Sequence, residues 1–154
     1  MTPEKKSNGK RVGFWVIAVF VTLGSITLQQ GFAQAKDPTA CTLATLNGMY
    51  VFDATGYNIV NGSAVPKAVA EFLNFKGDGT LTSLATLSVN GNIVQHDAAG
   101  TGSYAINQDC TGMLTFSPSG LTFDLFIAPN GSRFHMIETV TGTVLAGSAR
   151  RVGR

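Results

Sequence analysis

The sequence has few of the residues on which most catalytic and metal sites depend. Its 154 residues include two cysteines and two histidines, and only 13% of them are charged. Two cysteines and two histidines spread along the chain do not give the ligand spacing of a zinc site. The chain also lacks a Gly-x-Ser-x-Gly elbow, a serine–lysine pair and a phosphate-binding glycine loop. We therefore expect no metal and no cofactor, and the motifs leave open whether the protein is an enzyme.

Beyond its first 35 residues, the chain has no apolar pattern of period 3.6 long enough for a confident helix. Glycine-containing turn signals such as Asn61-Gly62, Asn90-Gly91, Ala99-Gly100 and Asn130-Gly131 recur instead, and the Asn-Gly pairs favour the positive φ of tight hairpins. The runs between the turns are rich in valine, threonine, phenylalanine and isoleucine, as strands are. They predict strands near residues 48–55, 66–76, 80–89, 92–97, 101–107, 111–117, 121–128, 132–140 and 143–150.

Apolar residues alternate with polar ones within these runs. In "LTFDLFIA", for example, Leu121, Phe123, Leu125 and Ile127 share one strand face. Strands with one wet face and short connections predict an antiparallel meander. A meander of eight or nine strands must hide its edges, and closure into a barrel does so completely. The fold class predicted is therefore all-β, a single up-and-down antiparallel β-barrel of about eight strands, with a β-sandwich as the alternative.

The N-terminal segment has the features of a secretory signal peptide. Four cations precede residue 12, an uncharged run covers 13–28, and Ala33-Gln34-Ala35 follows. A basic start, an apolar middle and small residues at a cleavage site are, in this order, typical of a secretory signal peptide. The run has 16 residues, whereas a transmembrane helix needs ~20. We predict a signal peptide at 1–35, a barrel domain at 36–154, and an exported protein, periplasmic or extracellular, with no membrane contact after cleavage.

Removal of residues 1–35 changes the charge of the protein. Residues 36–154 keep seven Lys and Arg against eight Asp and Glu, a formal net charge of −1. No basic stripe remains to neutralise phosphate groups, so nucleic acid is excluded as a partner.

Both cysteines, Cys41 and Cys110, lie in the part that would be exported. Disulfides persist in oxidising compartments, so the even count predicts one bridge between them. Such a bridge would pin the start of the domain to the hairpin "GSYAINQDCTGMLTF" at residues 102–116. Two separate buried thiols are the alternative.

Four segments carry a resemblance to a known group of proteins. They are "LNGMYVF", "FLNFKGDGTL", "GTGSYAINQDCTGMLTF" and the closing "GSAR". In this order they resemble small exported bacterial proteins with an allene oxide cyclase-like barrel, which is a calycin-like fold. The resemblance implies a small closed barrel, in which the enzymes of the class cyclise apolar substrates. No catalytic residue of those enzymes matches a position here, so none is carried over.

Carboxylates with apolar neighbours are the candidate catalytic groups. Glu71 alternates with Val69, Leu73 and Phe75, so it lies in an apolar lumen if that face points inward. There its pKa should rise, as suits a general acid or base. The sequence leaves both orientations open and prefers the outward one. Asp53 is interpreted as a solvated strand residue.

The run "SRFHMIETV" offers a second carboxylate. Phe134, Met136 and Glu138 share one face, and Arg133 and His135 share the other. The apolar pair favours Glu138 as the inward residue, with Arg133 and His135 exposed. His96 and Asp97 are interpreted as part of a solvated loop and not as metal ligands.

Three functions remain open. The first is binding of a small apolar or amphipathic molecule in the lumen, with Phe75, Phe123, Phe134, Met136 and Tyr104 as candidate contacts. The second is a cyclase or isomerase that uses Glu71 or Glu138, which a wide lumen with an inward carboxylate would favour. The third is a filled barrel that serves as a structural or interaction module. Apolar groups on both faces of residues 121–128 leave room for a homo-oligomer.

Overall fold

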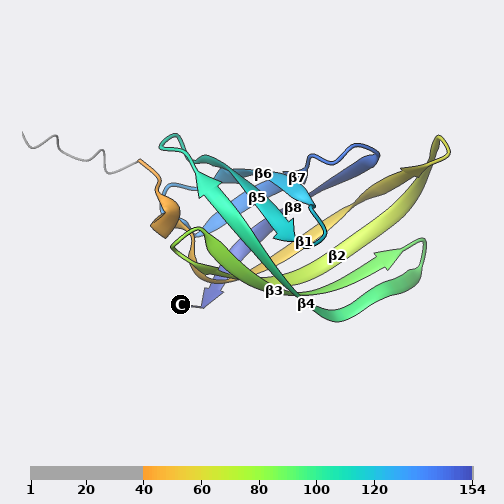
Figure 1. The fold of residues 1–154 in the computed structure, drawn as a ribbon, viewed down its shortest axis with the longest axis horizontal. Coiled ribbons are helices and arrows are strands. Elements are labelled where there is room, and N and C mark those ends of the chain that lie inside the picture. Colours follow the sequence, from red (N-terminus) through yellow and green to blue (C-terminus); the bar gives the residue numbers. More distant parts are fainter. Residues whose placement is uncertain (1–39, 154) are drawn as a thin grey trace, which may run out of the picture. The chain divides into compact units, whose positions relative to one another are not determined.

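The computed structural model describes residues 40–153. They form a short 3₁₀ helix and eight strands, each antiparallel to the next, and β8 also pairs with β1 (Figure 1). The elements are η1 (Leu43–Thr45), β1 (Asn47–Val60), β2 (Ser63–Lys76), β3 (Thr80–Val89), β4 (Asn92–Ile106), β5 (Thr111–Ser117), β6 (Thr122–Ile127), β7 (Arg133–Glu138) and β8 (Thr143–Gly153).

This closed eight-stranded barrel confirms the predicted fold class and excludes the sandwich. The predicted signal peptide lies outside the described residues. Among residues 40–153, no helix is long and apolar enough to span a membrane.

The predicted turn at Ala99-Gly100 is wrong. Residues 92–97 and 101–107 are not separate strands, because β4 runs unbroken through Gly100. The register between β3 and β4 shifts near Leu87, and Asp97 has a φ of 46°. This is a β-bulge, which bends a strand without ending it. Gly100 serves close packing, because a Cβ there would lie 2.6 Å from Oγ of Ser83.

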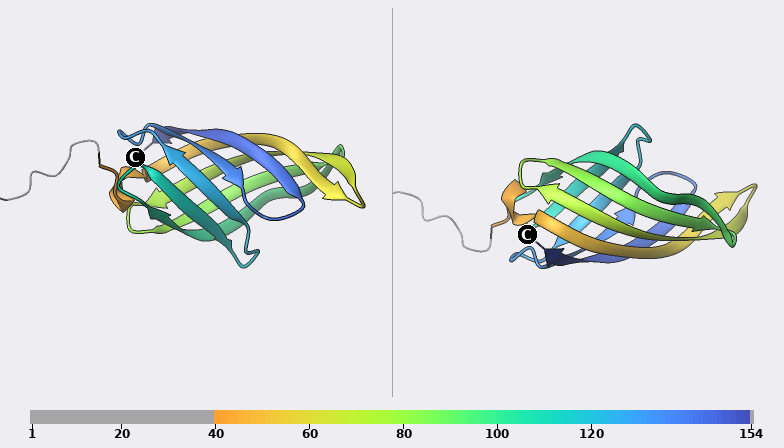
Figure 2. Two further views of the ribbon diagram at one scale, coloured as in Figure 1. Left: turned by 90° about the horizontal axis from the view of Figure 1, so that it is seen from above. Right: turned by 90° about the horizontal axis from the view of Figure 1, so that it is seen from below.

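The wall of the barrel has unequal height. β1 and β2 have 14 residues each and β4 has 15, whereas β6 and β7 have six each. The β1–β2 and β3–β4 hairpins therefore project beyond the β5–β6 hairpin, as both views of Figure 2 show. Pro66 was predicted to begin a strand, but it lies within β2, which begins at Ser63. It is tolerated because pairing of β2 with β3 begins only at Lys67.

The end of the barrel that carries η1, here called the closed end, is packed solid. Tyr50, Phe75, Tyr104 and Phe134 are buried there, with neighbouring ring centroids 4.9–5.6 Å apart, mostly edge to face. The hydroxyl of Tyr104 donates to the carbonyl oxygens of Leu43 in η1 and of Leu46, which follows it. These hydrogen bonds hold η1 over the aromatic rings.

A hydrogen-bond cluster seals the seam between the first and last strands at the closed end. Arg151 of β8 donates from Nε and Nη2 to the Tyr50 hydroxyl, and from Nη2 to the carbonyl of Thr45. The Tyr50 hydroxyl in turn donates to the carbonyl of Gly131 at 2.6 Å. One guanidinium group thus connects β8, β1 and η1.

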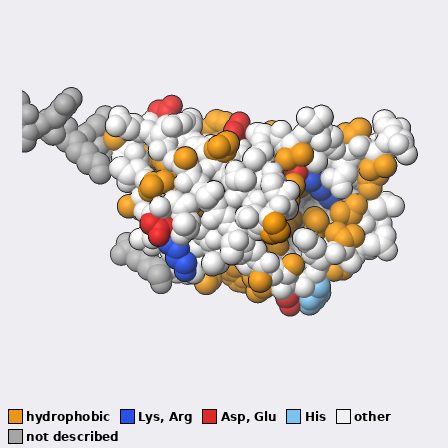
Figure 3. Space-filling model, in the orientation of Figure 1, with side chains coloured by type: hydrophobic (Ala, Val, Ile, Leu, Met, Phe, Trp, Pro, Cys, Tyr) orange, Lys and Arg blue, Asp and Glu red, His pale blue; other side chains and the backbone are white. Residues whose placement is uncertain are grey.

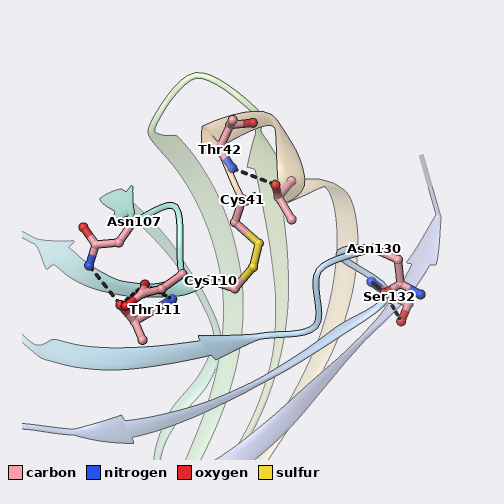
Figure 4. The surroundings of a disulfide bond; sticks show 9 residues. Cys41, Thr42, Asn107, Cys110, Thr111, Asn130 and Ser132 are labelled. Atoms are coloured by element: carbon pink, nitrogen blue, oxygen red, sulfur yellow. Dashed lines mark hydrogen bonds between the residues drawn. A yellow bond between two sulfur atoms is a disulfide. The ribbon is translucent and has the colours of Figure 1, made fainter. Parts of the chain in front are cut away.

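The predicted disulfide is confirmed. Cys41 and Cys110 are bonded, with their Cα atoms 5.0 Å apart, and both are buried (Figure 4). The backbone N–H of Cys41 also donates to the carbonyl of Gln108. The bridge fastens the segment before η1 to the β4–β5 turn at the closed end. A buried disulfide is compatible with an oxidising, exported environment.

Candidate functional site

The half of the barrel away from η1 contains a cavity of about 410 Å³. Ligand pockets commonly fall between ~300 and 1,000 Å³. In Figure 3 hydrophobic side chains surround a hollow in the right-hand part of this face, and basic and acidic side chains are visible within it. Apolar side chains that line the cavity include Phe52, Val69, Ala85, Leu87, Phe116, Phe123, Val140 and Leu145. Its only charged lining residues, among those the structure describes, are Lys67, Glu71 and Glu138.

An ion pair crosses the cavity wall from β2 to β7. Nζ of Lys67 lies 2.6 Å from Oε2 of Glu138, and the two side chains are 8% and 1% exposed. The register brings Lys67 opposite Gly56 of β1, and Gly56 opposite Leu145 of β8. A Cβ at Gly56 would collide with the carbonyl of Val144 on β8, so β1 carries no side chain at the position between Lys67 and Leu145. A buried pair of this kind is costly to break, since the partner left behind is an unpaired buried charge.

Only one oxygen of Glu138 is engaged by this pair. Oε1 is buried and accepts no hydrogen bond from any residue of the described range. Buried polar atoms in native proteins are nearly always hydrogen-bonded, so this oxygen is an unused acceptor at the cavity.

Glu71 also points into the cavity, so the preference for its outward orientation is wrong. The inward stripe of β2 is Val69, Glu71, Leu73 and Phe75, and Phe72 is left 47% exposed on the outer wall. Leu73 and Phe75, which follow Glu71 on the same face, are buried and keep this face inward. The opposite face, with Ala68, Ala70 and Phe72, is exposed. Burial raises the pKa of Glu71 from 4.5 to about 7, and a hydrogen bond with Ser83 partly opposes this rise.

The registers show that the two carboxylates lie in the same layer of the barrel. A row of paired residues from Glu71 passes Phe52 and Ala149 and reaches Phe134 on β7. Once round the barrel, such a row returns to its starting strand ten residues out of step. Three of these eight steps lie between β2 and β7, so they account for nearly four of the ten residues. The residue of β7 that lies level with Glu71 is therefore four positions beyond Phe134, at Glu138. Strand tilt and stagger are linked in this way in closed barrels.

A regular pair of β3 and β4, next to the bulge, shapes the wall beside Glu71. Ser83 faces the cavity from β3 and pairs with Gly100 of β4. The absence of a side chain at Gly100 leaves room for the Ser83 hydroxyl next to the carboxyl of Glu71. The glycine that looked like a turn in the sequence is thus part of the candidate site.

The five apolar contacts predicted for a ligand are distributed unevenly. Phe123 lines the cavity. Phe75, Phe134, Met136 and Tyr104 are buried in the packed closed end and are not among the cavity-lining residues. Alternation correctly gives their inward direction, but it does not tell the depth at which the lumen is filled.

Other candidates lie on the outer wall as predicted. Asp53, Arg133 and His135 are exposed. His96 and Asp97 are exposed as predicted, but the predicted loop is wrong, because both residues lie within β4, with Nδ1 and Oδ2 3.3 Å apart. In residues 40–153, no three His, Cys, Asp or Glu side chains gather closely enough to hold a metal ion.

Sequence reasoning missed Lys67, Phe116 and Ser83. Lys67 follows Pro66 at the apparent start of a strand, where a lysine is normally solvated. The one available signal was that Lys67 shares the parity of Val69 and Glu71, so an inward Glu71 requires an inward Lys67.

Comparison with protein-family models, with curated proteins and with solved structures finds no match for this chain. The site therefore has to be interpreted from its own geometry.

Proposed function

We propose that this protein is exported and binds a small apolar or amphipathic molecule in its barrel lumen. The observation that carries the proposal is the cavity of about 410 Å³, enclosed by aromatic and aliphatic side chains on strands of the barrel. Polar groups converge on it from several strands, as in sites that orient a ligand. The leader-like N-terminal segment and the buried disulfide support export.

The packed closed end supports binding rather than passage through the barrel. Aromatic rings and η1 fill that end, so a ligand can enter only from the side of the long hairpins. An open cavity above a filled floor also favours a binding protein over a barrel that is filled throughout.

Cavity filling tests the proposal. The probe is N-phenyl-1-naphthylamine, which fluoresces in apolar sites, added to the exported, oxidised full-chain product. Ala85 lines the cavity, whereas Ala70 is exposed on the neighbouring strand. We expect the wild-type protein and Ala70→Phe to bind the probe and Ala85→Phe to lose most of the signal. Equal signals from all three proteins would place the probe elsewhere and contradict lumen binding.

A cyclase or isomerase of the allene oxide cyclase-like kind is the second candidate, and Glu71 favours it. A carboxyl whose pKa is about 7 can both take and return a proton at neutral pH. In an isomerisation, Glu71 would remove a proton from one carbon of an apolar substrate and return it to another, so no oxidant or reductant is needed. Turnover of an unsaturated substrate by wild type and not by Glu71→Gln, with probe binding intact, would support catalysis. Equal turnover would refute the role of Glu71.

A further inference from the structure

The charges of the cavity do not balance, and this restricts the ligand. Two carboxylates, Glu71 and Glu138, face the same layer of the lumen, but the only cation among the lining residues is Lys67. The ammonium of Lys67 is already held by Oε2 of Glu138 at 2.6 Å. An anionic ligand would therefore meet two carboxyl groups and no free positive partner.

Oε1 of Glu138 indicates which kind of ligand group would bind favourably in the cavity. The side chain is 1% exposed, and this oxygen accepts no hydrogen bond from the described residues. A buried carboxylate oxygen is satisfied best by a charged donor, and such bonds are about twice as strong as neutral ones. The polar side chains nearby, including Asn58, Ser83 and Thr143, leave the oxygen unpaired.

The rest of the cavity is suited to an apolar body. Phe52, Phe116, Phe123 and Leu145 line it, and the carboxylate layer lies just above the packed floor. A ligand that enters from the hairpin end therefore brings its leading end to the carboxylates and leaves its tail against aromatic and aliphatic side chains.

We propose that the lumen binds a cationic amphiphile, an amine with an apolar tail whose nitrogen donates to Oε1 of Glu138 in the layer shared with Glu71. This inference rests on the proposed function of lumen binding. An ammonium group has three N–H donors, enough for Oε1 and for a second acceptor. Pairing with a carboxylate offsets the cost of burying the cation, whereas an alcohol brings one neutral donor to Oε1 and an ionised carboxylic acid brings none.

Three probes of equal tail length test the class of ligand. n-Octylamine, n-octanol and sodium octanoate would each compete with N-phenyl-1-naphthylamine on the exported, oxidised protein at pH 8. We expect the amine to bind about tenfold or more tightly than the alcohol, in line with a hydrogen bond to a charged group, and octanoate to bind most weakly. If octanol or octanoate competes as well as the amine, the lumen binds ligands but the amine inference fails. If none of the three competes, the proposed function itself fails.

Matched variants locate the effect. Glu138→Gln should remove the preference for octylamine, whereas Asp124→Asn, which changes an exposed carboxylate on β6, should keep it. Circular dichroism at the temperature of the assay shows whether Glu138→Gln is folded. An amine preference that survives in folded Glu138→Gln overturns the inference.

A pH series gives an independent readout that does not depend on that variant. The titratable groups that line the cavity are Lys67, Glu71 and Glu138, with none from the other described strands. Octylamine stays protonated below pH ~10, as a lysine amine does, while Glu71 loses its proton near pH 7. Octylamine affinity should therefore rise several-fold between pH 6 and pH 8 in wild type and stay flat in Glu71→Gln. A flat wild-type profile contradicts the proposal.

Discussion

The inward position of Glu71 has a consequence for stability that can be measured without a ligand. Burial raises its pKa from 4.5 to about 7, so the folded protein holds this proton more tightly than the unfolded chain. The native state then binds more protons between these two values, and the free energy of unfolding falls as pH rises through that window. The contribution is complete below pH 4.5 and is lost above pH 7. One pKa unit corresponds to about 1.4 kcal/mol, so the loss amounts to about 3 kcal/mol.

The assay is urea denaturation followed by circular dichroism at half-unit steps from pH 4 to pH 8. Wild type should lose about 3 kcal/mol more than Glu71→Gln over this range, because glutamine has no proton to release. The exposed Asp78 and Asp109, whose pKa values are lowered by hydrogen bonds from Thr80 and Thr111, are present in both proteins and cancel in the difference. Asp124→Asn serves as the exposed control and should follow wild type. Parallel curves for wild type and Glu71→Gln would show that Glu71 is solvated and that its inward assignment is incorrect.

Three further predictions concern the frame of the site. Reduction of the disulfide, which spans 69 residues of sequence, should lower the free energy of unfolding by up to about 4 kcal/mol, measured in urea with and without dithiothreitol; no change would mean that the bridge does not constrain the unfolded chain. Lys67→Met should cost about 3–5 kcal/mol because Glu138 is left charged and buried, and adding Glu138→Leu should recover most of that; a double variant no better than the single one would refute the coupling. Gly100→Ala should cost about 1–3 kcal/mol through its clash with Ser83, and Ser83→Ala should relieve it in thermal melts; additive losses would place the strain elsewhere.

Much of the barrel could be predicted because alternation and turn chemistry are local. Asn61-Gly62 and Asn90-Gly91 adopt the positive φ of hairpin turns, and the stripe from Phe123 to Ile127 is buried as expected. Closure followed from the need to protect edges. What failed was Gly100, because a glycine needed for a turn and a glycine needed for close packing look the same in one sequence. The spatial neighbour that distinguishes them, Ser83, is 17 residues away.

The candidate site was harder to predict than the fold for a related reason. Period-2 alternation assigns a side chain to the inside, but depth along the barrel depends on the stagger between strands that are distant in sequence. Phe134 and Glu138 share a face of β7, yet one lies in the packed floor and the other in the cavity. The partnership of Lys67 with Glu138 joins positions 71 residues apart and could not be predicted from either neighbourhood.

The positions of residues 40 and 153, which bound the described barrel, decide how this barrel is oriented when it is attached to something else. Residue 40, tied through Cys41 to the β4–β5 turn, and Gly153, which pairs with Met49, lie together at the closed end (Figure 1). A fusion partner, an affinity tag or a solid support joined at residue 40 or at residue 153 is thereby kept at the closed end. Such a tether leaves the opposite end of the barrel, with the long hairpins and the cavity, accessible to solutes. The proximity of residues 40 and 153 suits circular permutation of the barrel, with new ends opened at the β1–β2 turn without cutting a strand of the cavity wall.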